Sequence, residues 1–333
     1  MTTQEKTPGT SAPSMPSKFN WSLITKNGGV FALLVILLFN ILITPNFLHP
    51  QTLFVNISQV ATIAIVAVGM TLVIATGGID LSVGAIMALS GALAPLIFTS
   101  DFAAANPQLG LALSIVVPIL VALLCGVFNG ALVSLLNVQP IVATLIFFIS
   151  GRGIALVLTN GNLQTFNHDA FSYLGTGKIL GLPFQGWLVL VIAIAVWWLV
   201  SYTIFGRQLL AVGGNERAAK LSGVPVNRVK IGAYVICAGL SGLAGLIVVA
   251  INSASDAARI GNLMELDAIA AAVVGGTLLQ GGKAPIFGAI LGAVIIQLVK
   301  YTLLANGVAD EVALIAKAGI IILAVYVQQA RKE

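Results

Sequence analysis

The feature that most constrains the fold is a long uncharged stretch near the N-terminus. The 53 residues from Asn27 to Ile79 contain no Asp, Glu, Lys or Arg. Because a membrane-spanning helix needs about 20 consecutive apolar residues, this stretch is long enough for two crossings. Across all 333 residues, 58% are hydrophobic and 8% are charged, whereas soluble domains are roughly 45–50% apolar and about 25% charged. The composition excludes an ordinary soluble domain and predicts a polytopic membrane protein.

The apolar runs predict an all-α transmembrane bundle of about ten helices with both termini cytoplasmic. The expected helices cover residues 29–45, 53–76, 82–99, 110–136, 141–158, 186–204, 230–252, 265–280, 284–304 and 311–329. The expected divisions are a disordered cytoplasmic tail at 1–28, a transmembrane domain at 29–329 and a cytoplasmic C-terminus at 330–333. An inner loop at 205–229 and an outer loop at 159–185 are long enough to contact partners.

The distribution of basic residues predicts the orientation of the bundle. With the N-terminus inside, the outer loops contain only Lys178 and Arg259. The inner side then receives Lys6, Lys18, Lys26, Arg207, Arg217, Lys220, Arg228, Lys230, Lys283, Arg331 and Lys332. Cytoplasmic loops of membrane proteins carry such an excess of Lys and Arg. This distribution explains the net charge of +5 without nucleic-acid binding, so no nucleic-acid partner is expected.

Sequence motifs for catalysis or metal binding are absent. Lys283 follows two glycines, but Thr277 stands where a Walker A motif begins with glycine, and Ala284 replaces the hydroxyl residue that would bind magnesium. His49 and His168 belong to no nucleophile or metal pattern. We therefore expect no catalytic residue, no metal site and no cofactor held by this chain.

The inner loop contains start and stop signals for one short helix. Asn215 can cap the first N–H groups, and Glu216 suits the positive end of the helix dipole. Gly223 can adopt the left-handed conformation that ends a helix, and Pro225 prevents its continuation. The expected helix has about two turns, which is marginal in isolation. It either lies on the bundle or is held by a cytoplasmic partner.

Several segments together resemble the permease subunits of ribose-, arabinose- and galactose-type sugar importers of the ATP-binding cassette (ABC) class. They are Gly77-Gly78-Ile79-Asp80-Leu81-Ser82-Val83-Gly84, Gly213-Gly214-Asn215-Glu216-Arg217-Ala218-Ala219, Glu265-Leu266-Asp267-Ala268-Ile269-Ala270 and Val274-Gly275-Gly276-Thr277 through Gly281-Gly282-Lys283. The resemblance covers residues 53 to 328. The stretch Arg217-Ala218-Ala219-x-x-x-Gly223 also resembles the cytoplasmic coupling loop of ABC importer permeases, with Arg217 at the position where that pattern has glutamate. The segments 151–153 and 165–167 resemble the galactofuranose-type members.

The resemblance implies an assembly in the bacterial inner membrane. An ABC ATPase subunit, which binds ATP and magnesium, would dock on residues 207–230, and a periplasmic sugar-binding protein would deliver a monosaccharide. A second permease copy or a paralogue would complete a dimer in the lipid bilayer, and alternating access would move the sugar inward. The residues implied in ATPase coupling are Asn215, Glu216, Arg217, Ala218, Ala219 and Gly223.

Polar residues inside apolar runs are candidates for lining the translocation path. These are Asp80, Asn56, Gln59, Asn129, Thr144 and Gln297. Such residues also stabilise helix–helix packing in membranes, and Asp80 can serve as a structural cap after the Gly77–Gly78 break. Glu265 and Asp267 suit the dipole at a helix start.

Two glycine motifs and one arginine suggest contacts within the bundle, and two alternative functions remain open. The motifs Gly126-x-x-x-Gly130 and Gly288-x-x-x-Gly292 permit close helix approach within the chain or across a dimer. Arg152 either reaches a membrane interface or anchors the outer loop. A permease of the same fold for branched-chain amino acids or a furanosyl signal, and an ion-coupled secondary transporter, are the alternative functions.

Overall fold

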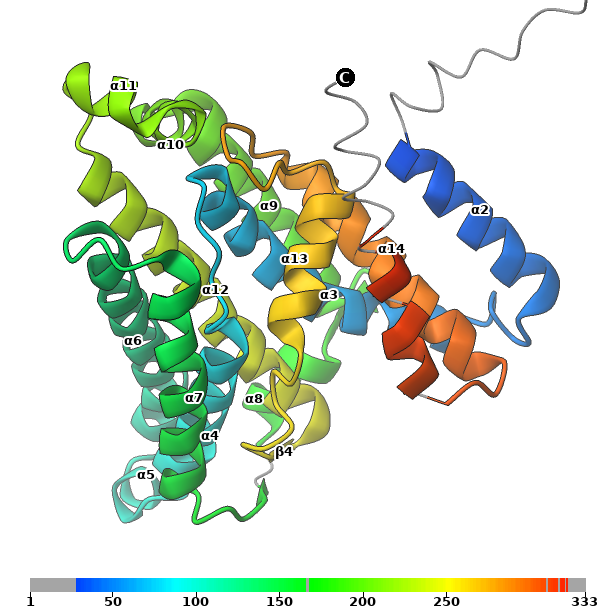
Figure 1. The fold of residues 1–333 in the computed structure, drawn as a ribbon. Coiled ribbons are helices and arrows are strands. Elements are labelled where there is room, and N and C mark those ends of the chain that lie inside the picture. The colour runs from blue at the N-terminus through cyan, green and yellow to red at the C-terminus, as the bar shows by residue number, and fades with distance from the viewer. Residues whose placement is uncertain (1–27, 166–167, 310, 317, 321, 323–333) are drawn as a thin grey trace, which may run out of the picture.

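The computed structural model describes residues 28–165, 168–309, 311–316, 318–320 and 322, and most of them are helical (Figure 1). The helices are α2 Gly28–Ile43, α3 Pro50–Ala75, α4 Val83–Phe98, α5 Asp101–Ala105, α6 Pro107–Ser134, α7 Pro140–Leu158, α8 Asp169–Thr176, α9 Phe184–Tyr202, α10 Ile204–Gly214, α11 Glu216–Leu221, α12 Val226–Asn252, α13 Met264–Val274 and α14 Ile286–Ala305. Four two-residue strands are β1 Gln164–Thr165, β2 Lys178–Ile179, β3 Leu182–Pro183 and β4 Ala254–Ser255.

Six of the described helices are long and apolar enough to cross a membrane: α3, α6, α7, α9, α12 and α14. Helices α2 and α4 are apolar but shorter. The structure therefore agrees with an all-α polytopic bundle, while the number of spans and the sides of the termini stay predictions. Residues 1–27 of the expected tail, the expected C-terminus at 330–333 and much of the helix expected at 311–329 lie outside the described residues.

Several helices begin next to proline or end next to glycine, and some of these ends differ from the expected ranges. Proline occupies the first turn of α3, α6 and α7, where its missing N–H costs nothing. Helix α12 begins at Val226, directly after Pro225, so the expected start at residue 230 was wrong. Helix α13 ends at Val274 rather than at residue 280, because Gly276 has a φ of +97°.

The inner segment 205–229 is not an open loop, because helices α10 and α11 occupy most of it. Both helices lie at one end of the bundle (Figure 1). Helix α10 was missed because the expected ranges treated residues after 204 as a polar connection. Its apolar side chains Leu209 and Val212 are buried against the bundle, and this packing stabilises an amphipathic helix of 11 residues.

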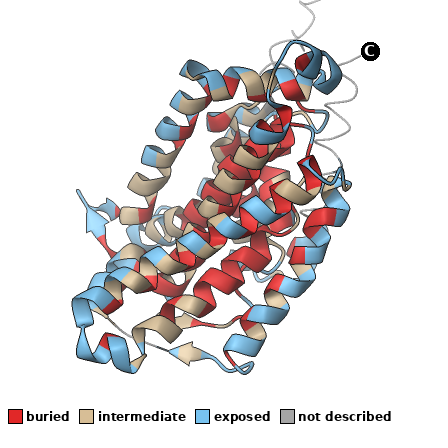
Figure 2. Cartoon of the chain, turned by 90° about the vertical axis from the view of Figure 1, so that its left-hand side faces the viewer, coloured by how far each residue is buried: buried red, intermediate tan, exposed pale blue. Residues whose placement is uncertain are grey.

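Helices α3 and α12 form the centre of the bundle. Helix α12 packs against α6, α3 and α4, and α3 also packs against α14, α13 and α9. Figure 2 shows buried residues concentrated along the inner helices and exposed residues along the outer ones. Large exposed apolar side chains are frequent on α2, α6, α7 and α9. An outer surface of this kind suits contact with lipid.

Both small-xxx-small motifs pack within the chain. A Cβ added at Gly126 would lie 2.7 Å from the backbone of Val235, and one at Gly130 would lie 2.8 Å from Ile231, so these glycines bring α6 against α12. Gly288 and Gly292 place α14 against the backbone of α13. The structure thus confirms that these motifs pack helices of the same chain against each other. The absence of side chains at the glycines lets the helix axes come close together.

Short strands join the loops at the end of the bundle opposite α11. Strand β1 pairs antiparallel with β4. Strands β2 and β3 form a hairpin whose turn contains Leu180 and Gly181, both with positive φ. The described residues of the predicted outer segment 159–185 therefore include short strands and helix α8, and β1 contacts β4 in the loop after α12. Phe166 and Asn167 lie outside the described residues.

Candidate functional site

The local structure predicted for the inner loop is confirmed in detail. The side-chain oxygen of Asn215 accepts a hydrogen bond from the Ala218 N–H at 3.0 Å, which caps the start of α11. At the other end Gly223 has a φ of +81°. The N–H of Val224 donates to the carbonyl of Ala219 at 3.0 Å. These bonds satisfy backbone groups that a six-residue helix would otherwise leave to solvent.

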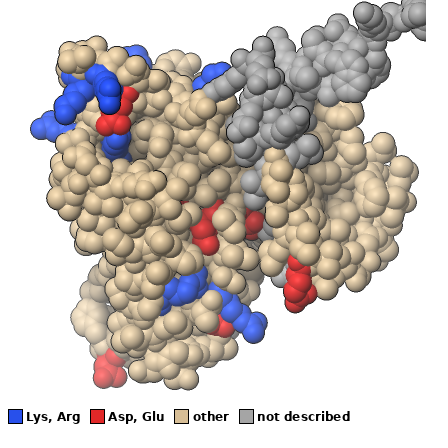
Figure 3. All heavy atoms as spheres, viewed as in Figure 1, with Lys and Arg blue, Asp and Glu red and all other residues tan. Residues whose placement is uncertain are grey.

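The residues of α11 divide into a face against the bundle and a face toward solvent. Ala219 is 5% exposed and packs within this chain. Leu221 is 90% exposed, although it is a large apolar residue. Arg217, Ala218 and Lys220 are exposed beside it, and Figure 3 shows many basic side chains gathered over α10 and α11. Ala219 thus packs α11 against the bundle. Leu221 is the apolar side chain of α11 most available to a partner.

An ion pair fixes α11 to the bundle. The Nζ of Lys230, in the second turn of α12, lies 2.7 Å from Oε2 of Glu216, the first residue of α11. The Lys230 side chain is 15% exposed and that of Glu216 is 53% exposed. Partial burial of the lysine limits screening by water. The pair therefore links the first residue of α11 to the second turn of α12.

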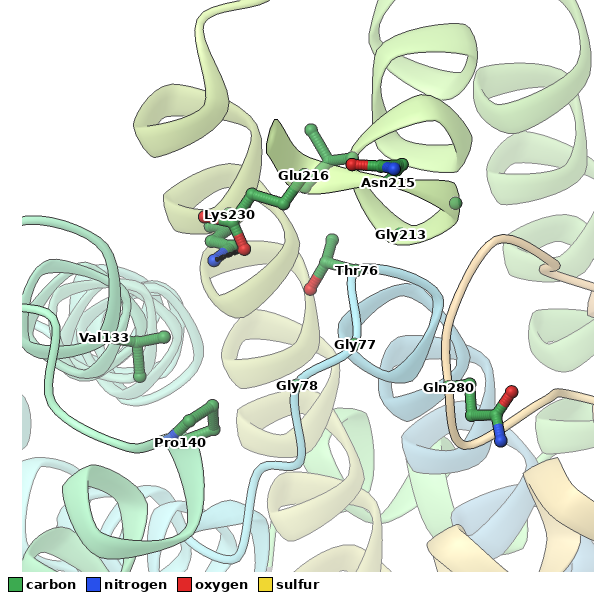
Figure 4. Close-up of a pocket in the computed structure, with 12 residues that line it drawn as sticks. Thr76, Gly77, Gly78, Val133, Pro140, Gly213, Asn215, Glu216, Lys230 and Gln280 are labelled. Atoms are coloured by element: carbon green, nitrogen blue, oxygen red, sulfur yellow. Dashed lines mark hydrogen bonds and ion pairs between the residues drawn. The ribbon is translucent and has the colours of Figure 1, made fainter. Parts of the chain in front are cut away.

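Beside this ion pair is a hollow of about 340 Å³ (Figure 4). Its walls come from the ends of α3 and α10, the ends of α6 and α7, and the loop between α13 and α14. The lining residues are Thr76, Gly77, Gly78, Val133, Pro140, Val212, Gly213, Gly214, Asn215, Glu216, Lys230 and Gln280. The hollow thus connects the capped helix α11 with the break between α3 and α4.

The break between α3 and α4 contains a buried polar network. Gly77 has a φ of +80°, which lets the chain leave α3. One oxygen of Asp80 accepts from the N–H of Ser82 at 2.9 Å and from its hydroxyl at 2.5 Å. The amide nitrogen of Asn129, on α6, donates to the same hydroxyl at 2.7 Å. Asp80 is fully buried, and among the residues that the structure describes, Oδ2 of Asp80 and Oδ1 of Asn129 have no hydrogen-bond partner.

Two further side chains hold the backbone of this break. The hydroxyl of Thr144, on α7, accepts from the Leu81 N–H at 3.0 Å. The hydroxyl of Tyr234, on α12, donates to the Ile79 carbonyl at 3.4 Å. The structure therefore brings Asp80, Asn129 and Thr144 into one cluster. Asp80 thus holds the turn that precedes α4 through the Ser82 N–H. The described contacts show no side-chain cap on the first turn of α4, where Ser82 is the N-cap residue.

The other three predicted path residues lie elsewhere. The side chain of Gln297, on α14, donates to that of Gln59, on α3. Asn56 donates to the Thr52 carbonyl of its own helix at 3.0 Å. Asn56 and Gln59 lie in the half of α3 nearer its N-terminus, and Gln297 reaches that half from α14. The six candidates therefore form two groups rather than one continuous line.

A buried contact at Glu265 was missed by the sequence reasoning. Glu265 and Asp267 do lie in the first turn of α13, as predicted. However, Glu265 is only 4% exposed, and a Cβ added at Gly84 would lie 2.6 Å from its Oε2. Arg152 donates to the carbonyls of Ala257 and Ala258, both at 3.0 Å, and thereby anchors the loop before α13. A dipole argument alone gives no signal for this burial.

Within the ranges that the structure describes, no three His, Cys, Asp or Glu side chains form a group suited to a metal ion. Residues 277–284, of which Gln280 lines the hollow, do not match the Walker A sequence. What the arrangement offers is a capped surface helix, an adjacent hollow and a polar network at a helix break.

Comparison with known proteins places most of the chain in one group of similar sequences. Residues 53–325 match the family model described as "Branched-chain amino acid transport system / permease component". The ribose import permease protein of Escherichia coli (strain K12) is 39% identical over 323 residues, which cover 94% of this chain and 97% of that protein. The galactofuranose transporter permease protein of the same strain is 37% identical, covering 97% and 94%.

A third relative comes from a different organism. The L-arabinose ABC transporter permease protein of Azospirillum brasilense is 32% identical, covering 100% of this chain and 96% of that protein. No solved structure matches the chain. The sequence similarity therefore extends over the break at Gly77–Ser82, helix α11 and the loop between α13 and α14 together.

Proposed function

Because the chain belongs to the family of permease components of branched-chain amino acid transport systems, we propose that it is the membrane-spanning subunit of an ABC importer for a monosaccharide. The observation that carries this proposal is the similarity, over nearly the whole chain, to permeases named for ribose, galactofuranose and L-arabinose. These relatives favour a sugar over a branched-chain amino acid, despite the wording of the family description.

Helix α11 is the proposed docking element for the partner ATPase. Its caps make it a defined helix, the Glu216–Lys230 ion pair fixes it to α12, and Leu221 projects into solvent. A single apolar side chain surrounded by basic residues suits insertion into a pocket of a soluble partner with acidic groups at its rim. ATP and magnesium belong to that partner, because this chain has no Walker A sequence.

The orientation follows from the same end of the molecule. Basic residues gather over α10 and α11 (Figure 3), so this end faces the cytoplasm by the positive-inside rule. The opposite end, with α8 and the β2–β3 hairpin, then faces the periplasm of a bacterial inner membrane and meets the sugar-binding protein. A second permease copy or a paralogue covers part of the exposed apolar surface, and lipid covers the rest.

Alternating access requires a segment that can change conformation without unfolding the bundle. The break at Gly77–Ser82 meets this requirement, since it interrupts the helical backbone beside the hollow and is held by side chains from α6, α7 and α12. Asp80, Asn129 and Thr144 offer hydrogen-bonding groups suited to sugar hydroxyls when the break opens. Loose binding there favours release into the cytoplasm.

The proposal is tested by uptake into proteoliposomes that contain the chain with the ATPase and binding protein encoded beside it. Labelled ribose, arabinose, galactose, fructose and leucine are offered outside, with ATP and magnesium inside. We expect uptake of one sugar that requires ATP and the binding protein. Uptake of leucine alone would assign the amino-acid alternative. Uptake that continues without ATP and stops when ion gradients are collapsed would assign an ion-coupled transporter.

A further inference from the structure

Three segments that are far apart in the sequence meet backbone to backbone at the edge of the hollow. They are the last turn of α3, the last turn of α10 and the loop between α13 and α14. The N–H of Gly282 donates to the carbonyl of Ala75 at 2.9 Å. A Cβ added at Gly213 would overlap that same carbonyl oxygen and would lie 2.5 Å from the nitrogen of Gly282. Gly213 and Gln280 both line the hollow (Figure 4).

The nearest atoms at this contact belong to the backbone on each side. A Cβ added at Gly281 would lie 2.8 Å from the Gly213 carbonyl oxygen and 3.0 Å from the nitrogen of Gly77. Gly281 and Gly282 both have positive φ, at +90° and +80°, which favours glycine at each position. Side chains absorb small displacements by changing rotamer, whereas touching backbones pass a displacement on. A shift of α10 therefore acts directly on the end of α3.

One side of this contact is joined to the proposed docking helix α11, and the other side is joined to the break between α3 and α4. One residue, Asn215, is both the last cap of α10 and the first cap of α11, so the two helices cannot move far independently. On the other side, Ala75 ends α3 just before the break that carries Asp80. The chain thus offers a continuous path of backbone from the proposed docking helix to the buried polar network.

A second path reaches the same break through α12. Glu216 pairs with Lys230 at 2.7 Å. Tyr234 lies one helical turn further along α12, and its hydroxyl bonds to the Ile79 carbonyl. A Cβ added at Gly78 would lie 2.7 Å from that hydroxyl. Both paths therefore begin at the ends of α10 and α11 and finish within residues 75–79.

We propose that movement of α11 reaches the Gly77–Ser82 break through both paths together, the three-way contact of Gly213, Ala75 and Gly282 and the path from Lys230 to Tyr234. The three-way contact passes the same movement to the loop between α13 and α14. Gly213 is a positioning residue in this account, because it touches neither ATP nor sugar. The inference rests on the proposed importer function and specifies how docking would act on the helix break. It also explains why residue 213 is glycine. Its φ is not positive, so the requirement for glycine comes from the close contact with Ala75 and Gly282.

The chain offers a matched pair of substitutions that tests this contact. Gly213→Ala places a methyl group against the Ala75 carbonyl, whereas Gly214→Ala has nothing within 4 Å of the added Cβ. Both glycines end α10, so the gain in helix propensity from alanine is similar in the two variants. Any difference between them reports the backbone contact rather than the stability of α10.

The variants are reconstituted with the ATPase and binding protein encoded beside the chain, and three quantities are measured. These are ATPase recovered with the permease, ATP hydrolysis with and without the binding protein loaded with the transported sugar, and uptake of that sugar. We expect Gly213→Ala to bind the ATPase normally but to lose about tenfold in sugar taken up per ATP hydrolysed. Gly214→Ala should match the wild type in all three measurements.

Wild-type coupling in an assembled Gly213→Ala complex would overturn the proposal. So would an equal loss in Gly214→Ala. If Gly213→Ala does not assemble, Tyr234→Phe tests the second path, because it removes one hydroxyl and keeps the ring; unchanged uptake per ATP in that variant would also overturn the account. A wild-type complex that fails to transport any sugar with ATP would instead contradict the proposed function itself, so the two failures are distinguishable.

Discussion

Replacing Ser82 by alanine tests whether the polar network stabilises the break between α3 and α4. The Ser82 hydroxyl donates to Asp80 and accepts from the Asn129 amide. Alanine removes both bonds and leaves the Asn129 nitrogen buried without an acceptor.

The size of the effect follows from these two bonds. The Asn129 nitrogen loses its acceptor, which costs about 1–3 kcal/mol in the free energy of unfolding, while the Asp80 carboxylate loses one of its two donors. The bond between Ser82 and Asn129 joins two helices, and such bonds in membrane proteins carry about 0.6–1.7 kcal/mol of coupling energy. The remaining loss belongs to the environment of Asp80, which keeps its bond to the Ser82 N–H.

The assay is equilibrium unfolding in mixed micelles, followed by far-ultraviolet circular dichroism. Ser82→Ala, Asn129→Ala and the double variant form a double-mutant cycle, from which the coupling energy is obtained directly. Ser134→Ala is the matched control, since its buried hydroxyl donates only to the Gly130 carbonyl of its own helix at 2.7 Å. That bond is local, so its loss should cost less than about 1 kcal/mol.

The reasoning would be refuted by a Ser82→Ala variant that is as stable as Ser134→Ala. It would also be refuted by strictly additive effects of Ser82→Ala and Asn129→Ala, since additivity would mean that the two side chains do not interact in the membrane-embedded protein.

Three further substitutions test separate parts of the account. Gly126→Ala should destabilise the protein by about 1–3 kcal/mol, because its Cβ would meet the α12 backbone, whereas Gly153→Ala, with nothing within 4 Å, should stabilise it by about 0.5–1 kcal/mol; equal unfolding midpoints would contradict the packing. Leu221→Ala should reduce the ATPase recovered with the permease without lowering its melting temperature, and full recovery would remove Leu221 from the docking surface. Arg152→Gln should increase proteolysis of the loop before α13, since it loses charged donors to the carbonyls there, and unchanged cleavage rates would show that Arg152 does not anchor this loop.

Features written in local sequence were predictable because their physics is local. The start of α11 at Asn215 and its end before Gly223 follow from the hydrogen-bonding needs of helix termini. The same holds for the first turn of α13, where Glu265 lies as expected. Apolar runs likewise located the helices that could span a membrane, since each run is long enough by itself.

Features that depend on contacts between distant segments could not be predicted. The burial of Ala219 follows from how α11 lies on the bundle, so an acidic substitution there would disturb packing and would not report docking alone. Glu265 is buried because Gly84 permits close approach of α4 to the start of α13. The contact of Gly213 with Ala75 and Gly282 joins three segments whose proximity no local pattern indicates.

The central claim, that this chain is the permease of a sugar importer powered by a separate ATPase, is tested most directly by ATP hydrolysis in proteoliposomes. The chain, its ATPase and its binding protein are combined singly, in pairs and together, with each sugar of the panel. The account predicts stimulation by one sugar only when all three proteins are present. An ATPase that neither associates with this chain nor responds to the loaded binding protein would contradict the account.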